Sequence, residues 1–391
     1  MKPVFICSLV LSFSVVFSLT RLPHGNAMLC STIIDTDYLY YEETSPFTIT
    51  ASGFDVNPIG EIVLISSPVG LYLYDARTLM PLKTVHCGAN NYVYAWSPDG
   101  SQFALYYSTC IGIEIWSAES LTIQQTLTFH EDSPYCTDPF PEEPYAPSGM
   151  VNQLAWSSTG RYLAARASGS IPTRIWNLSA GTLVISTSSS NAGEIAWSPD
   201  SSTLAYARSE SCIVEGWTLS EERFEELFEI PCVSRPPTAN LGIYWLSWSS
   251  ANQIAVSGAS LDNPIFLWDA NIGNLSETQY VGASDLSWSP EGSILASVVR
   301  PEIGDEGHND IILLDTSVNL THRITSIDER ITEIAWHPNG EAIFVLSADD
   351  VLSTQLRLYS IGNQGVDAFL YSCITWRKEN ADFDCVNFAS Q

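Results

Sequence analysis

The stretch Ala95-Trp96-Ser97-Pro98-Asp99-Gly100 decides the fold, because the chain repeats it. Further copies of this stretch start at Ala155, Ala196, Ser247, Ser287 and Ala335. In the full motif, proline suits the second position of a β-turn, Asp or Asn suits the third, and glycine accepts the positive φ that ends the turn. Apolar residues alternate on both sides of the turn, as in Tyr92, Tyr94, Trp96 and then Phe103 and Leu105. The repeat therefore predicts a tight hairpin between two half-buried strands.

The spacing of the repeat predicts a ring of blades. Two degenerate copies, Val56-Asn57-Pro58-Ile59-Gly60 and Thr375-Trp376-Arg377, extend the series at its two ends. The register positions are then 56, 96, 156, 197, 248, 288, 336 and 376, and four of the seven steps are 40 or 41 residues, which is the length of one propeller blade. A second landmark closes the third strand expected in each repeat: Tyr74, Trp116, Trp176, Trp217, Trp268, Leu314 and Tyr359. Two landmarks in phase predict an all-β propeller of four-stranded blades.

With its W-S-P-D-G turns and W-D ending, seen at Trp268-Asp269, the sequence resembles the WD40-repeat and TolB-type propellers. The resemblance covers residues 28–391 and implies four-stranded blades around a central channel, with a role in binding other macromolecules. The Gly-His dipeptide of eukaryotic WD repeats is missing, so their His-Ser-Trp-Asp network is not implied here. We expect the repeated tryptophans to pack blade against blade, because a large aromatic ring buries the most area there.

We expect eight blades, provided that Val56 and Trp376 both count as first-strand landmarks. The eighth blade would combine strands at Trp376 and at residues 383–389 with outer strands from the N-terminal segment around Ile33-Ile34-Asp35. Such sharing between the two ends of the chain would leave no open sheet edge. The alternative is seven blades, with the N-terminal strand completing the last blade and the C-terminal hairpin left as an appendage.

Residues 1–27 have the pattern of a signal peptide. Lys2 is followed by an uncharged apolar stretch from Val4 to Leu19, and Gly25 and Ala27 are small residues at the spacing of a cleavage site. A membrane anchor is the alternative, but a bilayer needs about 20 apolar residues. We therefore expect a secreted or periplasmic protein in which residues 28–391 form a single propeller domain.

The charge of the chain limits its partners. It has 44 Asp and Glu against 16 Lys and Arg, a net charge of −28, which repels nucleic acid and anionic lipid. Solubility outside the cell explains this charge, and a cationic partner or bound calcium is the alternative. A calcium site would use the acidic run Glu302, Asp305, Glu306 and Asp310 around His308, which lacks the spacing of a calcium loop. We prefer a solvated loop there and expect no cofactor.

Eight cysteines remain when Cys7 is removed with the signal peptide, and an even number favours disulfides in an exported chain. The expected pairs are Cys87–Cys110, Cys212–Cys232 and Cys373–Cys385. Cys30 and Cys136 are left over, and their pairing is only a residual assignment.

No catalytic motif is present: no nucleophile elbow, zincin helix, phosphate loop or dinucleotide fingerprint. Two classes of function compete, a non-catalytic scaffold for a protein or peptide ligand and a propeller enzyme. A quinoprotein would need vicinal cysteines, which the chain lacks, and a glycan-acting hydrolase would need Asp or Glu converging from inner strands, which we interpret as apolar. We therefore prefer the scaffold and expect a monomer.

Binding is expected on the face that carries the second-to-third-strand loops and the connections between blades. Insertions at 129–149, 221–242 and 300–310 interrupt the repeat, and long loops on a rigid scaffold often bind partners. The second insertion begins with a short acidic pattern that predicts a helix. Tyrosine and arginine dominate binding hot spots, and the candidates on this face are Tyr92, Tyr106, Tyr107, Arg166, Arg208, Tyr244 and Arg300. The alternative is that the arginines pair locally with acidic loops.

Overall fold

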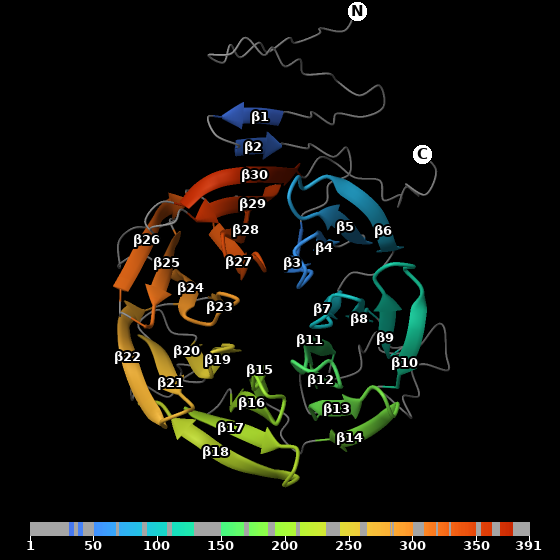
Figure 1. The fold of residues 1–391 in the computed structure, drawn as a ribbon, viewed down its shortest axis with the longest axis vertical. Helices are drawn as coiled ribbons and strands as arrows, with labels where there is room; N and C mark the ends of the chain where they lie inside the picture. Colours follow the sequence, from blue (N-terminus) through green and yellow to red (C-terminus); the bar gives the residue numbers. More distant parts are fainter. Residues whose placement is uncertain are drawn as a thin grey trace, which may run out of the picture.

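The computed structural model is a ring of four-stranded antiparallel sheets around a central axis (Figure 1). It describes residues 31–34, 38–41, 51–67, 70–87, 92–107, 112–128, 150–167, 172–186, 192–208, 212–231, 243–258, 264–281, 283, 285–299, 309–317, 320–327, 330–348, 353–361 and 368–377. Within these residues the regular secondary structure consists of β-strands, and no helix is long and apolar enough to cross a membrane.

Seven consecutive sets of four strands form seven blades, each with its first strand nearest the axis (Figure 1). Blade 1 contains β3 (Gly53–Val56), β4 (Ile62–Ser67), β5 (Gly70–Asp75) and β6 (Pro81–Cys87). Blade 2 contains β7 (Val93–Trp96), β8 (Gln102–Tyr106), β9 (Ile113–Ser117) and β10 (Ile123–Leu127). Blade 3 contains β11 (Val151–Trp156), β12 (Tyr162–Ala167), β13 (Arg174–Asn177) and β14 (Thr182–Ser186).

The remaining four blades follow in chain order. Blade 4 contains β15 (Ala192–Trp197), β16 (Thr203–Arg208), β17 (Ile213–Thr218) and β18 (Arg223–Glu229). Blade 5 contains β19 (Ile243–Trp248), β20 (Gln253–Gly258), β21 (Pro264–Asp269) and β22 (Asn274–Val281). Blade 6 contains β23 (Asp285–Trp288), β24 (Ile294–Val299), β25 (Asn309–Asp315) and β26 (Leu320–Ile327). Blade 7 contains β27 (Arg330–Trp336), β28 (Ala342–Ala348), β29 (Ser353–Ile361) and β30 (Ala368–Arg377).

The turn motif acts through local hydrogen bonds. Asp99 Oδ1 accepts hydrogen bonds from the Ser97 hydroxyl at 2.6 Å and from the Ser101 amide at 3.0 Å. Ser97 Oγ in turn accepts from the Gln102 amide at 3.0 Å. Gly100 has φ +69°, a conformation that costs glycine little. These contacts lie within six residues, so the first-to-second-strand hairpin is encoded locally.

The tryptophans at the ends of the innermost strands join one blade to the next. The indole N–H of Trp96 donates to the Asp55 carbonyl of blade 1 at 3.3 Å, and that of Trp156 donates to the Ala95 carbonyl of blade 2 at 3.0 Å. Trp197, Trp288 and Trp336 make the corresponding contact. Among the residues that the structure describes, the buried apolar side chains form seven clusters, and each cluster combines residues of two neighbouring blades. The core of this protein therefore lies between the blades, where the tryptophans were expected to pack.

The expectation of eight blades is wrong: the described strands form seven. Trp376 lies in β30, the outermost strand of blade 7, where it pairs with Thr354. It does not begin a new innermost strand. The seven-blade alternative also assigned the closing strand incorrectly, because β30 near the C-terminus completes blade 7. The N-terminal β1 (Ser31–Ile34) and β2 (Tyr38–Tyr41) form their own hairpin, and β2 lies beside β30 (Figure 1). The expected strand at 383–389 lies outside the described residues.

The helix expected at the start of the second insertion is also wrong. Residues Arg223–Glu229 form β18, which pairs with β17 along Ile213–Thr218. Pairing with an exposed strand edge outweighs the helix propensity of a short run rich in Glu and Leu, because propensity differences amount to only about 0.7 kcal/mol per residue. The chain thereby completes blade 4.

Candidate functional site: the crossover face and the centre of the ring

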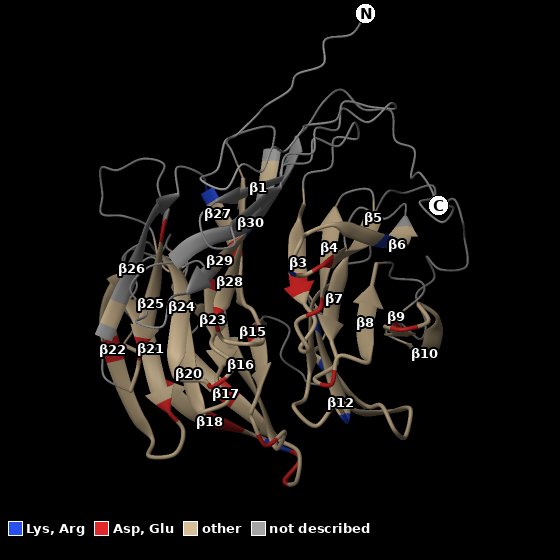
Figure 2. Cartoon of the chain, turned by 45° about the horizontal axis from the view of Figure 1, so that its top comes forward, with Lys and Arg blue, Asp and Glu red and all other residues tan. Residues whose placement is uncertain are grey.

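The two faces of the ring carry different connections. First-to-second-strand turns such as 97–101 and third-to-fourth-strand turns such as 75–80 lie on one face, called here the turn face. Second-to-third-strand loops and the connections between blades lie on the other, the crossover face. The segments 129–149, 232–242 and 300–308 join strands at the crossover face and lie outside the described residues. The described strands carry few Lys or Arg and more Asp and Glu (Figure 2).

Two of the candidate tyrosines come together at the boundary between blades 1 and 2. His86 Nδ1 and the Tyr92 hydroxyl are 2.9 Å apart, and the His86 and Tyr107 rings lie 4.1 Å apart. Glu114 is 5% exposed and accepts a hydrogen bond from the Trp116 indole at 2.9 Å. Burial, followed by the charge of Glu114 and a hydrogen bond to it, raises the pKa of Tyr107. These side chains form one aromatic and polar cluster next to the crossover face.

The other candidate tyrosines have different surroundings. Tyr106 is 1% exposed and belongs to the apolar cluster between blades 2 and 3, and burial raises the pKa of its hydroxyl. Its ring is therefore part of the core and is not available on the surface. Tyr244 in β19 is half-buried, with its ring 6.1 Å from that of Trp245.

The candidate arginines do not form one described surface. Arg166 in β12 is half-buried opposite Gln153, and the charge of Glu194 acts on it. Burial lowers the pKa of Arg166 and the charge of Glu194 opposes that shift. Arg208 is the last residue of β16, and its side chain lies outside the described residues, as does all of Arg300.

A set of polar side chains on the innermost strands connects neighbouring blades. Gln153 Oε1 accepts the Ile195 amide at 2.8 Å, and Gln153 Nε2 donates to the Ile195 carbonyl at 3.1 Å. Three carboxyl groups accept the corresponding amide of the next blade: Glu194 from Leu246 at 2.8 Å, Asp285 from Ile334 at 2.7 Å and Glu333 from Phe54 at 3.0 Å. We call these four the bridging residues. An innermost strand is a sheet edge with unpaired backbone groups, and the bridging residues satisfy some of them.

The interpretation of the inner strands as apolar was wrong. Gln153, Glu194, Asp285 and Glu333 each stand three residues before a tryptophan landmark, at 156, 197, 288 and 336. A polar residue repeating in phase with the tryptophans is a signal in the sequence, and it could have identified this set. Blade 1 has Gly53 at this position, and Asp55 of the same strand instead accepts the Trp96 amide at 3.2 Å.

The acidic groups converge on the centre of the ring and influence one another. The charge of Glu194 in blade 4 acts on Glu333 in blade 7, across the ring, as do the charges of Asp285 and Asp55. Burial raises the pKa of Asp55 and of Glu194 to about 7 and that of Asp285 to about 6, although hydrogen bonds from backbone amides lower each of them. Burial and the charge of Asp285 raise the pKa of Glu333 well above its usual range.

The carboxyl groups of this acidic centre are hydrogen-bonded to the backbone of the ring. Asp55, Glu194, Asp285 and Glu333 each accept a hydrogen bond from an amide of the next blade. In the part of the chain that the structure describes, no group of three or more His, Cys, Asp or Glu side chains is arranged to hold a metal ion. Of the acidic run considered for calcium, only Asp310 is described, and it is buried in β25.

The cysteines are described only in part. Cys212 is disulfide-bonded, and its partner lies outside the described residues, so its pairing with Cys232 remains a prediction. Cys110, Cys136 and Cys385 also lie outside them. Cys30 lies there too, whereas Cys87 and Cys373 are placed in β6 and β30 by their backbones alone.

Comparison with known proteins identifies the kind of propeller. No protein-family model matches the chain. It is 26% identical over 106 residues to WD repeat-containing protein AAC3 of Dictyostelium discoideum, and 27% identical over 121 residues to Elongator complex protein 1 of Saccharomyces cerevisiae. These matches cover 26% and 29% of this chain, and only 21% and 9% of the two relatives.

Solved structures match a much larger part of the chain. A chain of the mitotic checkpoint complex covers 88% of it at a TM-score of 0.55 and 17% identity, with 96% of that chain matched. The β-propeller domain of Cps50 (Swd1) from Myceliophteria thermophila covers 76% at a TM-score of 0.56 and 10% identity, with 93% of that chain matched. These structures show the fold, a β-propeller, and the sequence match to a WD repeat-containing protein supports a propeller similar to the WD40 type.

Two repeated contacts hold the centre of this propeller. The tryptophan indoles reach back to the preceding blade, and the bridging residues reach forward to the next. Because both contacts come from innermost strands, mutations there are expected to affect the whole ring.

Proposed function

We propose that this protein is an exported, non-catalytic scaffold that binds a protein or peptide through its crossover face. The observation that carries this proposal is the position of the long connections: the segments 129–149, 232–242 and 300–308 all join strands at that face. Long loops on a rigid framework are common binding elements. Two of the similar proteins are named for assemblies, the mitotic checkpoint and Elongator complexes, which suits a scaffold here too.

A hydrolytic function is less well supported, even though carboxyl groups converge on the centre of the ring. Each described carboxyl group there accepts a backbone amide of the next blade, so it contributes to the framework. A catalytic pair would need groups directed at a substrate at hydrogen-bonding distance. We therefore assign these residues to holding the ring.

Export, the class of partner and the subtype of propeller are parts of the same proposal. Residues 1–27 would direct export, and the excess of acid, 44 Asp and Glu against 16 Lys and Arg, would keep the mature monomer soluble and away from nucleic acid. The W-S-P-D-G turns support kinship with TolB-type propellers. N-terminal sequencing of protein from the native exported fraction tests the first part, with Met28 as the expected first residue.

The binding face is tested by capture of partners with two matched variants. The first replaces Arg166, Arg208 and Arg300 by alanine. The control replaces Arg77, Arg161 and Arg223 by alanine, which removes the same charge from exposed side chains of the turn face. We expect a partner captured by the wild-type and control proteins to be lost from the first variant, which must keep its β-rich circular dichroism. Equal capture by all three proteins would contradict the assignment of the face.

A further inference from the structure

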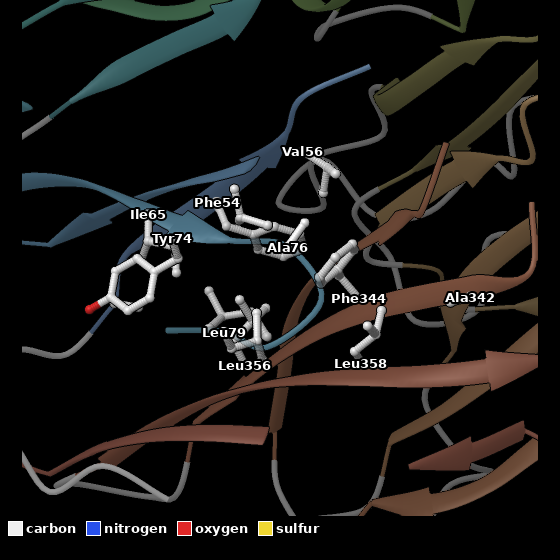
Figure 3. Packing of buried hydrophobic residues seen from close by; sticks show 13 residues of the cluster. Phe54, Val56, Ile65, Tyr74, Ala76, Leu79, Ala342, Phe344, Leu356 and Leu358 are labelled. Carbon is white, nitrogen blue, oxygen red and sulfur yellow. The ribbon is translucent and has the colours of Figure 1, made fainter. Parts of the chain in front are cut away.

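The ring closes between blade 7 and blade 1 without a shared strand. Blade 1 consists of β3 to β6 and blade 7 of β27 to β30, so each is built from consecutive strands. At the other boundaries the chain runs from the outermost strand of one blade to the innermost strand of the next. At this one, an apolar cluster packs Phe54 and Leu79 of blade 1 against Phe344, Leu356 and Leu358 of blade 7 (Figure 3). Opening of this boundary separates the two blades at this apolar cluster, and folded proteins undergo local and sub-global opening of this kind.

Two hydrogen bonds span this boundary beside the apolar cluster. The Ala51 amide donates to Thr354 Oγ1 at 2.7 Å, and the Phe54 amide donates to Glu333 Oε2 at 3.0 Å. Glu333 is the bridging residue of blade 7. Its contact with Phe54 joins the two innermost strands on either side of the closure, β27 and β3, whose backbones are neighbours.

Gln153 shows which form of a bridging side chain fits best. Its amide accepts the N–H and donates to the C=O of one residue, Ile195. A protonated carboxyl group has the same layout, with one oxygen that accepts and one O–H that donates, whereas a carboxylate can only accept. At the same position in blade 7, Glu333 Oε2 accepts the Phe54 amide, and a protonated Glu333 would also carry an O–H donor, as the Gln153 amide carries an N–H, which a carboxylate lacks.

The charged groups around Glu333 favour the proton. Asp285 from β23, Asp55 from β3 and Glu194 from β15 act on it, and all three are acidic. Among the described residues, the interactions resolved for Glu333 include no cation. Burial, followed by the charge of Glu333, raises the pKa of the Tyr94 hydroxyl well above its usual range, so that phenol stays neutral nearby.

We propose that the boundary between blades 7 and 1 is a proton-operated closure: Glu333 bridges to Phe54 in its protonated form, and loss of that proton loosens the ring at this boundary. Because Glu333 bridges in its neutral form, this boundary is expected to be most stable at low pH. This proposal does not depend on the identity of the partner, because it concerns only the framework.

The experiment measures hydrogen exchange of the full chain from pH 5 to pH 8, corrected for the intrinsic rate of amide exchange. In peptides that cover 51–57 and 330–336, we expect the opening equilibrium of the wild type to rise with pH, up to about tenfold per pH unit for one proton. In the Glu333→Gln variant, the opening equilibrium should depend less steeply on pH, and the decrease should correspond to the loss of about one titrating proton. Glu61→Gln removes an exposed acid of the neighbouring turn and should behave as the wild type.

The wild-type protein keeps the test decisive if Glu333→Gln fails to fold. A wild-type opening equilibrium in peptides covering 51–57 and 330–336 that does not rise with pH contradicts the proposal without any variant. His337 lies against Gly60 at the turn end of the same boundary. Burial lowers the pKa of His337, so its contribution makes opening less favourable as the pH rises, opposite to that of Glu333. The proposal is overturned if Glu333→Gln keeps the wild-type slope, or if protection at the closure stays constant or increases as pH rises.

Discussion

Gln153 of blade 3 holds both backbone groups of Ile195 in blade 4: its Oε1 accepts the amide at 2.8 Å and its Nε2 donates to the carbonyl at 3.1 Å. Replacing Gln153 by alanine leaves both groups without this partner on the innermost strand. An unsatisfied buried polar group costs about 1–3 kcal/mol, so we expect a loss of stability in that range. Urea unfolding measures it. Gln124→Ala is the control, because Gln124 is exposed and its side-chain amide donates hydrogen bonds to Thr122, two residues away in the same blade.

The tryptophan contacts are tested by removing one indole N–H. Trp336 donates to the Ser287 carbonyl of blade 6 at 3.1 Å, whereas Trp248 donates to Asn252 of its own blade at 3.0 Å. We expect Trp336→Phe to cost about 2 kcal/mol, from lost packing and an unsatisfied carbonyl. Trp248→Phe should cost less, because the Asn252 side chain also contacts Asn271. Equal losses in guanidinium unfolding would show that the contact between blades adds nothing.

The closure between blades 1 and 7 makes Gly60 sensitive to a small change. A Cβ at Gly60 would lie 2.7 Å from His337 Cε1, and the backbone there has φ +76°. Gly273 has a similar φ of +66° and nothing within 4 Å. Gly273→Ala therefore reports backbone strain alone, about 1 kcal/mol, and Gly60→Ala should cost more. The excess should shrink when His337→Ala is added, and thermal unfolding of the four proteins checks this. An unchanged excess would exclude a clash with His337.

The acidic centre predicts how stability changes with pH. Carboxyl groups whose pKa is raised in the folded state hold protons that the unfolded chain releases, so the folded state loses stability as pH rises from their unfolded values. For Asp55, Glu194 and Asp285 this window runs from about pH 4 to about pH 7. We expect the urea concentration at the unfolding midpoint to decrease as the pH is raised from 5 to 8. Asp55→Asn should reduce that fall, because the amide oxygen still accepts the Trp96 N–H. A midpoint that rises over this range would contradict the prediction.

Much of the framework was predictable from the sequence because its signals are local. The hairpin around Ser97 and Asp99 is held by contacts within six residues, and the third-strand landmarks such as Trp116 and Trp268 lie in third strands. The run at Arg223–Glu229 was predicted wrongly, because its conformation depends on pairing with β17 rather than on its own residues. Of the candidate contact residues, Tyr92 and Tyr107 lie together, while Tyr106 is buried. Alternation within a strand does not reveal which blade will cover a side chain.

The sequence by itself determined the blade: turn chemistry, strand alternation and the period of the repeat act over neighbouring residues. Only the tertiary structure decided how many blades close the ring and what lies at its centre. Trp376 matches the period of a first strand but pairs with Thr354 as the outermost strand of blade 7. Likewise, Glu194 and Glu333 are 139 residues apart in sequence, and the charge of Glu194 acts on Glu333 because the closed ring brings both strands to its centre. Both outcomes depend on contacts between distant segments, and a local pattern does not contain them.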